Sequence, residues 1–231
     1  MKTIVSMKNI HKHYANQQIE THALQGISLE IYQGEFVAIT GPSGCGKSTL
    51  LSIMGLMDSA TEGEYSITDI QTQGLSVDHR TQIRNQHIGY VFQSFNLIDS
   101  LTVFENVALP LEHRGEKPAH IKEKVNLCLE QVGMHHRAEY KPNQLSGGQQ
   151  QRIAIARALV GSPDLILVDE PTGNLDTKNG DQVMKLLADL NTQGSTIVMV
   201  THDSRYTRCA NRQINLLDGK IITEKNVKEV A

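Results

Sequence analysis

A glycine-rich run, Gly41–Thr49, restricts the folds open to this chain more than any other feature. It follows Phe36–Thr40, an apolar segment with the composition of a buried strand, and it precedes the apolar stretch Leu50–Met54, which fits a helix. Strand, glycine-rich loop and helix form the context in which the pattern Gly-x4-Gly-Lys-Ser binds phosphate. The run therefore predicts a phosphate-binding loop within an α/β fold.

The residue types of this loop suit a nucleotide. Glycines let backbone N–H groups converge on phosphate oxygens, and the N-terminus of the following helix favours an anion. Lys47 is expected to reach the β- and γ-phosphates, and the Ser48 hydroxyl to bind Mg²⁺, whereas Cys45 contributes only its backbone. The predicted phosphate loop comprises Gly41, Pro42, Ser43, Gly44, Cys45, Gly46, Lys47, Ser48 and Thr49.

Two more segments, Leu165–Asp169 and Thr196–Val200, are nearly continuous apolar runs like Phe36–Thr40. Such runs are typical of parallel strands that are covered on both faces. They alternate with helical patterns, which indicates an α/β fold with a parallel central sheet. Earlier strand-like segments predict a flanking antiparallel sheet. The other strand-like segments are Ile4–Ile10, Ile27–Ile31, Ile88–Phe92 and Ile214–Leu217.

Two apolar stripes at helical spacing have recognisable ends. The first stripe begins after Pro118 and stops at Gly133, and the second is closed by Gly194. We expect one domain, 1–231, in which a core with its β subdomain (1–93 and 162–231) carries an inserted helical subdomain (about 94–161). The stripes are Ile121, Val125, Cys128, Leu129 and Val132, then Val183, Leu186, Leu187 and Leu190.

Two polar stretches are expected to form loops or short strands. The segment from Asp58 to Arg80 is predicted to form loops and short strands rather than a domain boundary. The charged residues between Glu112 and Lys117 are predicted to form a solvated loop.

The composition narrows the class of protein. Hydrophobic residues make up 39% and charged residues 20%, as in a soluble globular domain. The net charge of −3, from 22 basic and 25 acidic residues, argues against a nucleic-acid partner. No apolar run approaches the roughly 18–20 residues that cross a bilayer. Three widely separated cysteines favour a reducing cytoplasm.

A pair of carboxylates, Asp169 and Glu170, ends the apolar run that begins at Leu165. A buried strand of this kind would bring Asp169 to its carboxyl end, beside the phosphate loop, where the carboxylate can bind Mg²⁺. Glu170 is then placed to orient and deprotonate an attacking water. Either carboxylate alone could instead cap the next helix.

The LSGGQ segment, Leu145–Gln149, is predicted to open a helix that runs through Ile153 and Leu159. Its Ser146, Gly147 and Gly148 would present N–H groups to an anion, although the phosphate loop already encloses its own phosphates. A capping role explains Ser146 but leaves the paired glycines unexplained.

The phosphate loop, the LSGGQ segment and the two carboxylates, in this order, resemble the ATPase subunit of an ATP-binding cassette (ABC) transporter. The resemblance runs from Tyr14 to Gly219. It implies an ATPase that uses ATP and Mg²⁺ and forms a head-to-tail dimer with a second copy of itself. In that dimer Ser146, Gly147, Gly148 and Gln149 of one copy close over the ATP of the other.

The resemblance also gives roles to four residues outside these motifs. It implies that Tyr14 stacks on adenine and that Gln93 contacts Mg²⁺ and water at the hinge into the helical subdomain. Asp176 matches a loop that touches the opposite subunit's site. His202 follows a core strand and matches the histidine that contacts the γ-phosphate.

Three further stretches look like the macrolide-export and lipoprotein-release group. That likeness implies a partner permease with an extracytoplasmic domain, because this chain has no room for a fused one. It places the ATPase on the cytoplasmic face of the inner membrane, with a lipoprotein, macrolide or peptide as substrate. The stretches are Gly55–Asp58, Phe92–Leu97 with the later Glu105–Val107, and Pro171–Asp176.

The ATPase residues leave one alternative open, an ATP-driven mechanical or signalling module that moves no substrate. A DNA-repair or chromosome-organising ATPase is disfavoured, because it would need a long coiled coil between the phosphate loop and the LSGGQ segment. A ribosome-acting factor of the same family usually carries two cassettes, whereas this chain carries one.

Overall fold

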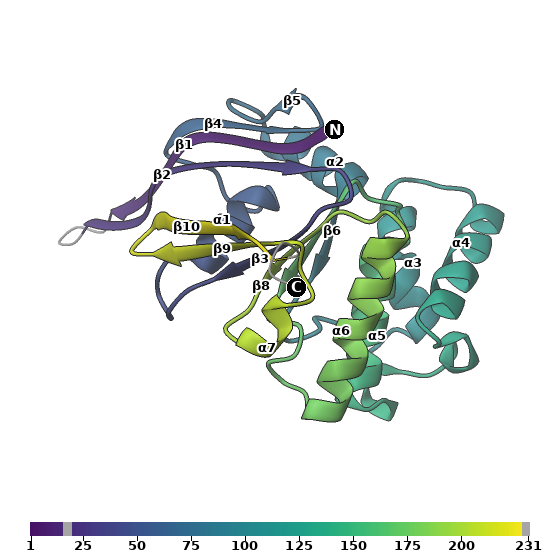
Figure 1. The fold of residues 1–231 in the computed structure, drawn as a ribbon. Helices are drawn as coiled ribbons and strands as arrows, with labels where there is room; N and C mark the ends of the chain where they lie inside the picture. Colours follow the sequence, from purple (N-terminus) through teal and green to yellow (C-terminus); the bar gives the residue numbers. More distant parts are fainter. Residues whose placement is uncertain (16–19, 228–231) are drawn as a thin grey trace.

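The computed structural model describes residues 1–15 and 20–227, which form two sheets and a group of helices (Figure 1). The strands are β1 (Thr3–Ala15), β2 (Glu20–Tyr32), β3 (Phe36–Thr40), β4 (Glu62–Ile67), β5 (Ile70–Gln71), β6 (Ile88–Val91), β7 (Leu165–Asp169), β8 (Ile197–Val200), β9 (Arg212–Leu217) and β10 (Lys220–Asn226). The helices are α1 (Lys47–Met54), α2 (Val77–His87), α3 (Val103–His113), α4 (Pro118–Gln131), α5 (Gly147–Leu159), α6 (Thr177–Thr192) and α7 (Ser204–Thr207).

The larger sheet has the strand order β10-β9-β3-β8-β7-β6. From β9 to β6 every neighbouring pair is parallel, and only the edge strand β10 runs antiparallel to its neighbour. The carboxyl ends of β3, β8 and β7 therefore meet at one edge of this sheet, the place where ligands bind in open α/β sheets.

Both faces of the central strands are buried, which explains why their sequences lack polar alternation. Along β3, Phe36 and Ala38 belong to one hydrophobic cluster, whereas Val37 and Ile39 belong to the other. Strands β7 and β8 divide in the same way. Because successive side chains of a strand point to opposite faces, the two clusters lie on opposite faces of the sheet.

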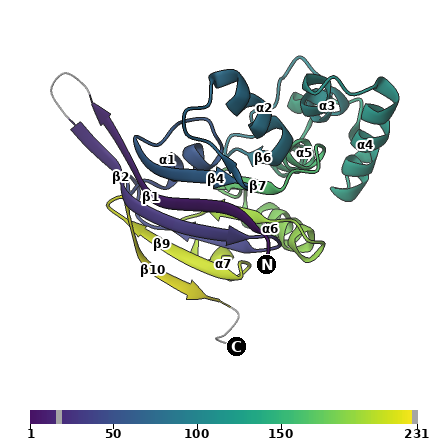
Figure 2. The ribbon, with the colours of Figure 1, turned by 90° about the horizontal axis from the view of Figure 1, so that it is seen from above.

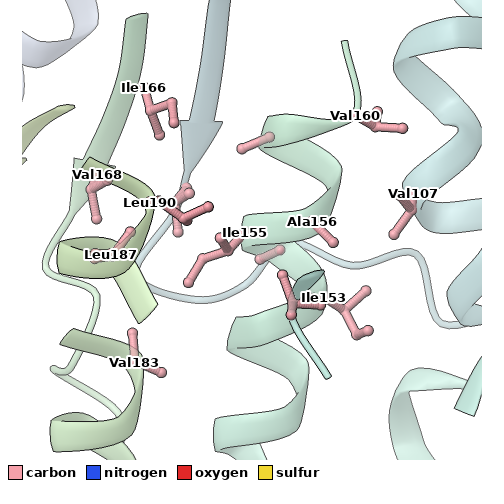
Figure 3. Packing of buried hydrophobic residues seen from close by; sticks show 14 of the residues in the cluster. Val107, Ile153, Ile155, Ala156, Val160, Ile166, Val168, Val183, Leu187 and Leu190 are labelled. Carbon is pink, nitrogen blue, oxygen red and sulfur yellow. The ribbon is translucent and has the colours of Figure 1, made fainter. Parts of the chain in front are cut away.

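Helices α3, α5 and α6 lie in the cluster on the first face of this sheet, and α4 packs on α3 and α5. Figure 3 shows side chains of α5 and α6, among them Ile155 and Leu187, beside Ile166 and Val168 of β7. The face of α4 that begins at Ile121 and the face of α6 that begins at Val183 are buried here. The two predicted apolar stripes are therefore confirmed as core faces.

Helix α1 and the antiparallel sheet, of order β2-β1-β4-β5, cover the second face. Figure 2 shows β1 and β2 of this layer lying beside β9 and β10 of the larger sheet. The predicted α/β fold, with a parallel central sheet and a flanking antiparallel sheet, is confirmed.

Between β6 and β7 the chain forms helices α3, α4 and α5 and two short 3-10 turns, His135–Arg137 and Pro142–Gln144. Local chemistry sets the helix ends. Thr102 and Glu105 form a reciprocal capping box at α3, and Pro118 occupies the first turn of α4. Gly133 has a φ of 70° just beyond α4, which suits a glycine after a helix.

Two predictions about polar stretches need correction. The segment 58–80 does contain β4 and β5, but α2 begins at Val77, capped by Ser76. No residue of α2 is buried among those described, so the helix has no apolar stripe to reveal it.

The charged segment 112–117 is also more than a solvated loop. The Arg114 guanidinium donates to Asn85 Oδ1 (3.0 Å) and to the Gly161 carbonyl (2.8 Å). Arg114 therefore ties α3 to the ends of α2 and α5, a contact that only the tertiary structure creates.

Within the described ranges, 1–15 and 20–227, no helix combines the length and the apolar character needed to cross a bilayer.

Candidate functional site

The phosphate loop connects the carboxyl end of β3 to the first turn of α1. Gly41, Gly44 and Gly46 have φ angles of 151°, 79° and 103°, a region that side chains disfavour. A Cβ on Gly41 would also lie 2.2 Å from the Leu216 carbonyl oxygen. Glycine is thus required at Gly41 by both backbone conformation and space.

The first turn of α1 is open to an anion. Its N-cap is Gly46, and in the described chain no side chain caps these N–H groups and no acidic residue lies in the turn. The first N–H groups of a helix lack intrahelical partners and carry partial positive charge. This geometry suits phosphate oxygens.

Lys47 lies inside this loop rather than on the surface. Its side chain is only 8% exposed, and Nζ donates to the Gly41 carbonyl (2.8 Å) and the Pro42 carbonyl (2.7 Å). Cys45 is buried, and its Sγ lies 3.8 Å from the same Nζ. The loop thus holds a positive charge at its centre.

Asp169 ends β7, which is separated from β3 by β8 alone. Desolvation, and then the nearby charge of Glu170, raise the pKa of the Asp169 carboxyl, whereas Lys47 lowers it. The three charged groups therefore interact across the strand ends. The predicted neighbourhood of loop and carboxylates is present in the structure.

Glu170 is the residue after β7 and has a strained backbone, with a φ of 42°. Its N–H donates to the Val200 carbonyl (3.0 Å), and its Oε2 lies 3.0 Å from His202 Nδ1. A left-handed conformation at a residue other than glycine costs about 1–3 kcal/mol and occurs often at functional sites. The surrounding contacts hold Glu170 beside His202.

Gln93 follows β6 and lies against the loop that comes after Glu170. The backbone carbonyl of Gln93 accepts a hydrogen bond from Asn174 Nδ2 (3.1 Å). A Cβ on Gly173 would lie 2.8 Å from the side-chain Nε2 of Gln93. Gln93 is therefore packed against the segment that follows the two carboxylates.

Tyr14 lies near the end of β1 and is 46% exposed. Its hydroxyl donates to Asp58 Oδ2 (2.9 Å), and Lys12 Nζ lies 4.8 Å from the ring centroid and 2.7 Å from Asp58 Oδ1. Desolvation, followed by the bond to Asp58, raises the pKa of Tyr14, and a bond with Thr49 of the phosphate loop lowers it. Tyr14 is therefore next to the phosphate loop.

The start of α5 shows why the LSGGQ segment has these residues. Ser146 is the N-cap: its Oγ accepts from the Gln149 N–H (3.4 Å), and Gln149 Oε1 accepts from the Ser146 N–H (2.9 Å). A Cβ on Gly148 would lie 2.6 Å from Asn179 Oδ1, so packing within the chain itself favours glycine at this position. The capping role of Ser146 does not explain the paired glycines, but the close approach of Asn179 explains Gly148.

Asp176 is the N-cap of α6 and is joined to the LSGGQ segment through Asn179. Its Oδ1 accepts from the Asn179 N–H (2.9 Å) and its Oδ2 from Asn179 Nδ2 (2.6 Å), bonds that lower the pKa of Asp176. The same Asn179 side chain packs on Gly148. Sequence reasoning missed Asn179. Its position was a usable signal, because Asn179 is the third residue of a helix capped by Asp176.

The predicted residues therefore form two groups. Tyr14, the phosphate loop, Gln93, Asp169, Glu170 and His202 lie around the carboxyl ends of the parallel strands. The segment from Ser146 to Gln149 lies beside Asp176, on helices that pack against the opposite face of the sheet from α1. Sequence reasoning also missed Lys12 and Asp58, because only the fold brings positions 12 and 58 together.

Comparison with known proteins agrees with this arrangement. A profile of the family "ABC transporter" matches residues 24–173. The ABC transporter ATP-binding protein MJ0796 of Methanocaldococcus jannaschii is 48% identical over 230 residues, which cover 97% of this chain and 98% of that protein. The macrolide export ATP-binding/permease protein MacB of Aggregatibacter actinomycetemcomitans is 44% identical over 227 residues, which cover 98% of this chain and 35% of MacB.

A solved structure has the same fold. It is the dimeric structure of a post-hydrolysis state of the ATP-binding cassette MJ0796 bound to ADP and Pi, with a TM-score of 0.89 and 46% identity over 97% of this chain and 99% of that chain. The glycine-lined loop, the paired carboxylates and the family match together identify this chain as an ATPase of the ABC transporter family, an ATP-binding subunit.

Proposed function

We propose that this chain hydrolyses ATP as one half of a head-to-tail dimer and thereby drives a membrane permease. The observation that carries this proposal is the separation of the two predicted groups. The phosphate loop leads into α1 on one face of the sheet, whereas the LSGGQ segment opens α5 on the other. A second copy of the chain can supply the missing half of each site, as the dimeric MJ0796 cassette suggests for a 46% identical chain.

In this proposal the phosphate loop and Tyr14 bind the nucleotide. Backbone N–H groups at the start of α1 and the Lys47 ammonium contact the phosphates, and the exposed ring of Tyr14 offers a surface for adenine. The ring lies beside Thr49, the last residue of the predicted loop.

Ser48, Gln93 and Asp169 would hold Mg²⁺. Hydroxyl, amide and carboxylate oxygens are the donors that this hard cation prefers, and Asp169 is half-buried next to Lys47. When bound, the cation neutralises charge on the phosphates. The donor set of this chain therefore fits the group.

Glu170 is proposed as the general base. Its carboxylate takes a proton from water, the water oxygen bonds to the γ-phosphorus, and the bond to the β–γ bridging oxygen breaks to give ADP and phosphate. His202 orients this carboxylate through its Nδ1, which lies 3.0 Å from Glu170 Oε2. The other side of the imidazole ring is then left to contact the γ-phosphate.

The partner copy would complete each site with Ser146, Gly147, Gly148 and Gln149, and with Asp176 close by. Two charge-assisted hydrogen bonds to each γ-phosphate contribute about 1.5–3 kcal/mol apiece. Two sites then give roughly 6–12 kcal/mol, comparable to the estimated ~4–15 kcal/mol cost of association. Loss of the γ-phosphate would therefore open the dimer.

A groove of about 830 Å³ offers a place for the permease. It lies between α2, β6 and α3, reaches the end of α5, and combines apolar Ile98 and Leu109 with the arginines Arg84, Arg114 and Arg157. This lining fits a partly apolar, acidic cytoplasmic segment of a membrane protein. Ile98 is 45% exposed, which leaves an apolar side chain open to a partner.

The remaining parts of the proposal rest on the same relatives. Segment 94–161 acts as the helical subdomain and the rest as the core, hinged at Gln93. The MacB relatives, named as macrolide export ATP-binding/permease proteins, suggest a lipoprotein, macrolide or peptide as substrate and a permease with an extracytoplasmic domain. The ATPase would then lie on the cytoplasmic face of the inner membrane.

Purification from native membranes tests the permease. We expect the full chain to retain an integral membrane protein, and Ile98→Glu to lose it. Leu127→Glu is the matched control, because Leu127 is 59% exposed on α4, outside the groove. Equal retention by both variants would contradict docking in the groove.

Reconstitution with that permease then tests transport. ATP-dependent release of lipoprotein, drug or peptide from proteoliposomes is expected. ATP hydrolysis without release of any of the three would instead indicate the mechanical or signalling module.

A further inference from the structure

The loop that follows Gln93 is strained at two adjacent residues. Phe95 and Asn96 have φ angles of 61° and 49°, and neither is glycine. A left-handed conformation at two consecutive residues with side chains is costly, so it persists only where surrounding contacts enforce it. The local bonds, from the N–H groups of Phe95 and Asn96 to the carbonyls of Phe92 and Ser94, lie within the loop itself and do not fix it to a neighbour.

Arg157 of α5 supplies the enforcing contact. Its Nη2 donates to the Phe95 carbonyl (2.8 Å) and its Nη1 donates to the Asn96 carbonyl (2.6 Å). The rigid fork of a guanidinium binds two acceptors in one fixed geometry. Arg157 is half-buried, and desolvation lowers the pKa of its guanidinium.

The loop touches α5 at its other end as well. The tip of the Phe95 ring, Cζ, lies 3.7 Å from the position a Cβ on Gly147 would take. Phe95 also packs against the cluster that contains Ile153 and Ile155 of α5. Helix α5 is one continuous helix from Gly147 to Leu159, so Gly147 and Arg157 are joined by a rigid element that rises about 1.5 Å per residue.

We propose that Arg157 is a positioning residue that fixes the loop carrying Gln93 to the helix that begins at the LSGGQ segment. The inference rests on the proposed function, in which Gln93 serves the chain's own site and the LSGGQ segment serves the partner's site. Arg157 makes these two parts move as one body. A partner's ATP that engages Ser146 therefore also sets the position of Gln93 in the opposite site.

A double-mutant cycle tests this inference in the full-length chain. The variants are Arg157→Met, which keeps length but removes both bonds, Arg157→Lys, Gln93→Ala and the pairs. Arg152→Met is the matched control, because Arg152 lies on the same helix and donates to Gln182 Oε1 (2.9 Å) rather than to the loop. The readouts are kcat and KM for ATP, with a thermal melt of each variant.

Arg157→Met is expected to lower kcat about 10- to 100-fold, the range for a catalytic group moved by about 1 Å. The KM is expected to change by less than about twofold, since the described bonds of Arg157 go to the loop after Gln93 and not to the phosphate loop. In the Gln93→Ala background, Arg157→Met should lower kcat by less than a further factor of about two. The effects of two residues that act through one group are not additive. Arg152→Met should stay within about twofold of the parent.

Two results overturn the inference: an unchanged kcat in Arg157→Met, or the same full loss repeated in the Gln93→Ala background. An unchanged kcat in Gln93→Ala instead overturns the role proposed for Gln93, and this inference falls with it. If Arg157→Met does not fold, Arg157→Lys replaces it in the double-mutant cycle with Gln93→Ala. Its single ammonium keeps the charge but cannot hold both carbonyls in the fork, so an intermediate loss of kcat that vanishes without Gln93 is expected.

Discussion

Lys47 is the residue on which we expect nucleotide binding to depend most. Its buried ammonium bonds to two loop carbonyls, so the loop is already shaped around a positive charge. We predict that Lys47→Ala lowers affinity for a fluorescent ATP analogue at least tenfold, since one charge-assisted hydrogen bond contributes about 1.5–3 kcal/mol. Lys185→Ala, at an exposed position of α6, is the control. Equal affinity of the two variants would refute the assignment.

Asp169 should make the chain less stable at neutral pH than at acid pH. Its pKa is raised by desolvation, so between the unfolded and folded pKa values the folded state binds more protons and stability falls as pH rises. We predict that Asp169→Asn raises the Tm at pH 7 without nucleotide, by about 2–4 °C for each 1 kcal/mol relieved.

The pH dependence separates this effect from a general gain of stability. The difference between Asp169→Asn and the parent should shrink as the pH falls through the raised pKa. Asp189→Asn, at an exposed position of α6, should leave the Tm unchanged. A Tm difference that is constant from pH 4 to pH 8 would contradict the electrostatic origin.

At the scale of elements, helices α5 and α6 are held together where Gly148 meets Asn179. We predict that Gly148→Ala lowers the free energy of unfolding by about 1–3 kcal/mol, because the new methyl would lie 2.6 Å from Asn179 Oδ1. Urea unfolding measures the change. The cost should be smaller in an Asn179→Ala background, which removes the clashing oxygen.

Gly147→Ala is the matched control for this packing. Its added methyl would lie 3.3 Å from Leu175 Cδ2, the mobile end of a side chain, so a smaller cost is expected. If the two alanine variants lost equal stability, the contact with Asn179 would not be the cause, because helix propensity favours alanine over glycine at both positions.

The elements that the sequence predicted well are those whose neighbours are all apolar. Strands β3 and β7 follow from continuous apolar runs, because burial on both faces demands them. Helix α2 escaped prediction, because none of its residues is buried and no apolar stripe accompanies its N-cap, Ser76. The bridge from Arg114 to Asn85 and Gly161 joins residues far apart in the chain, so no local pattern carries it.

At the scale of the whole molecule, the prediction concerns assembly. Glu170→Gln keeps the shape of the site but removes the proposed base, so we predict that ATP hydrolysis slows by at least about 100-fold while ATP still binds. The bound triphosphate should then hold two copies together. Light scattering with ATP is expected to give twice the monomer mass, and with ADP the monomer mass. A Glu170→Gln protein that stays monomeric with ATP would count against the shared site.

The sequence by itself determined the α/β class, the phosphate loop and the pair Asp169 and Glu170, because each follows from residues adjacent in the chain. The tertiary structure decided the rest. It put Lys12 and Asp58 beside Tyr14, placed Asn179 between Gly148 and Asp176, and bound Arg157 to the loop after Gln93. These contacts join distant segments, and their geometry depends on how helices and strands pack, which local sequence patterns do not encode.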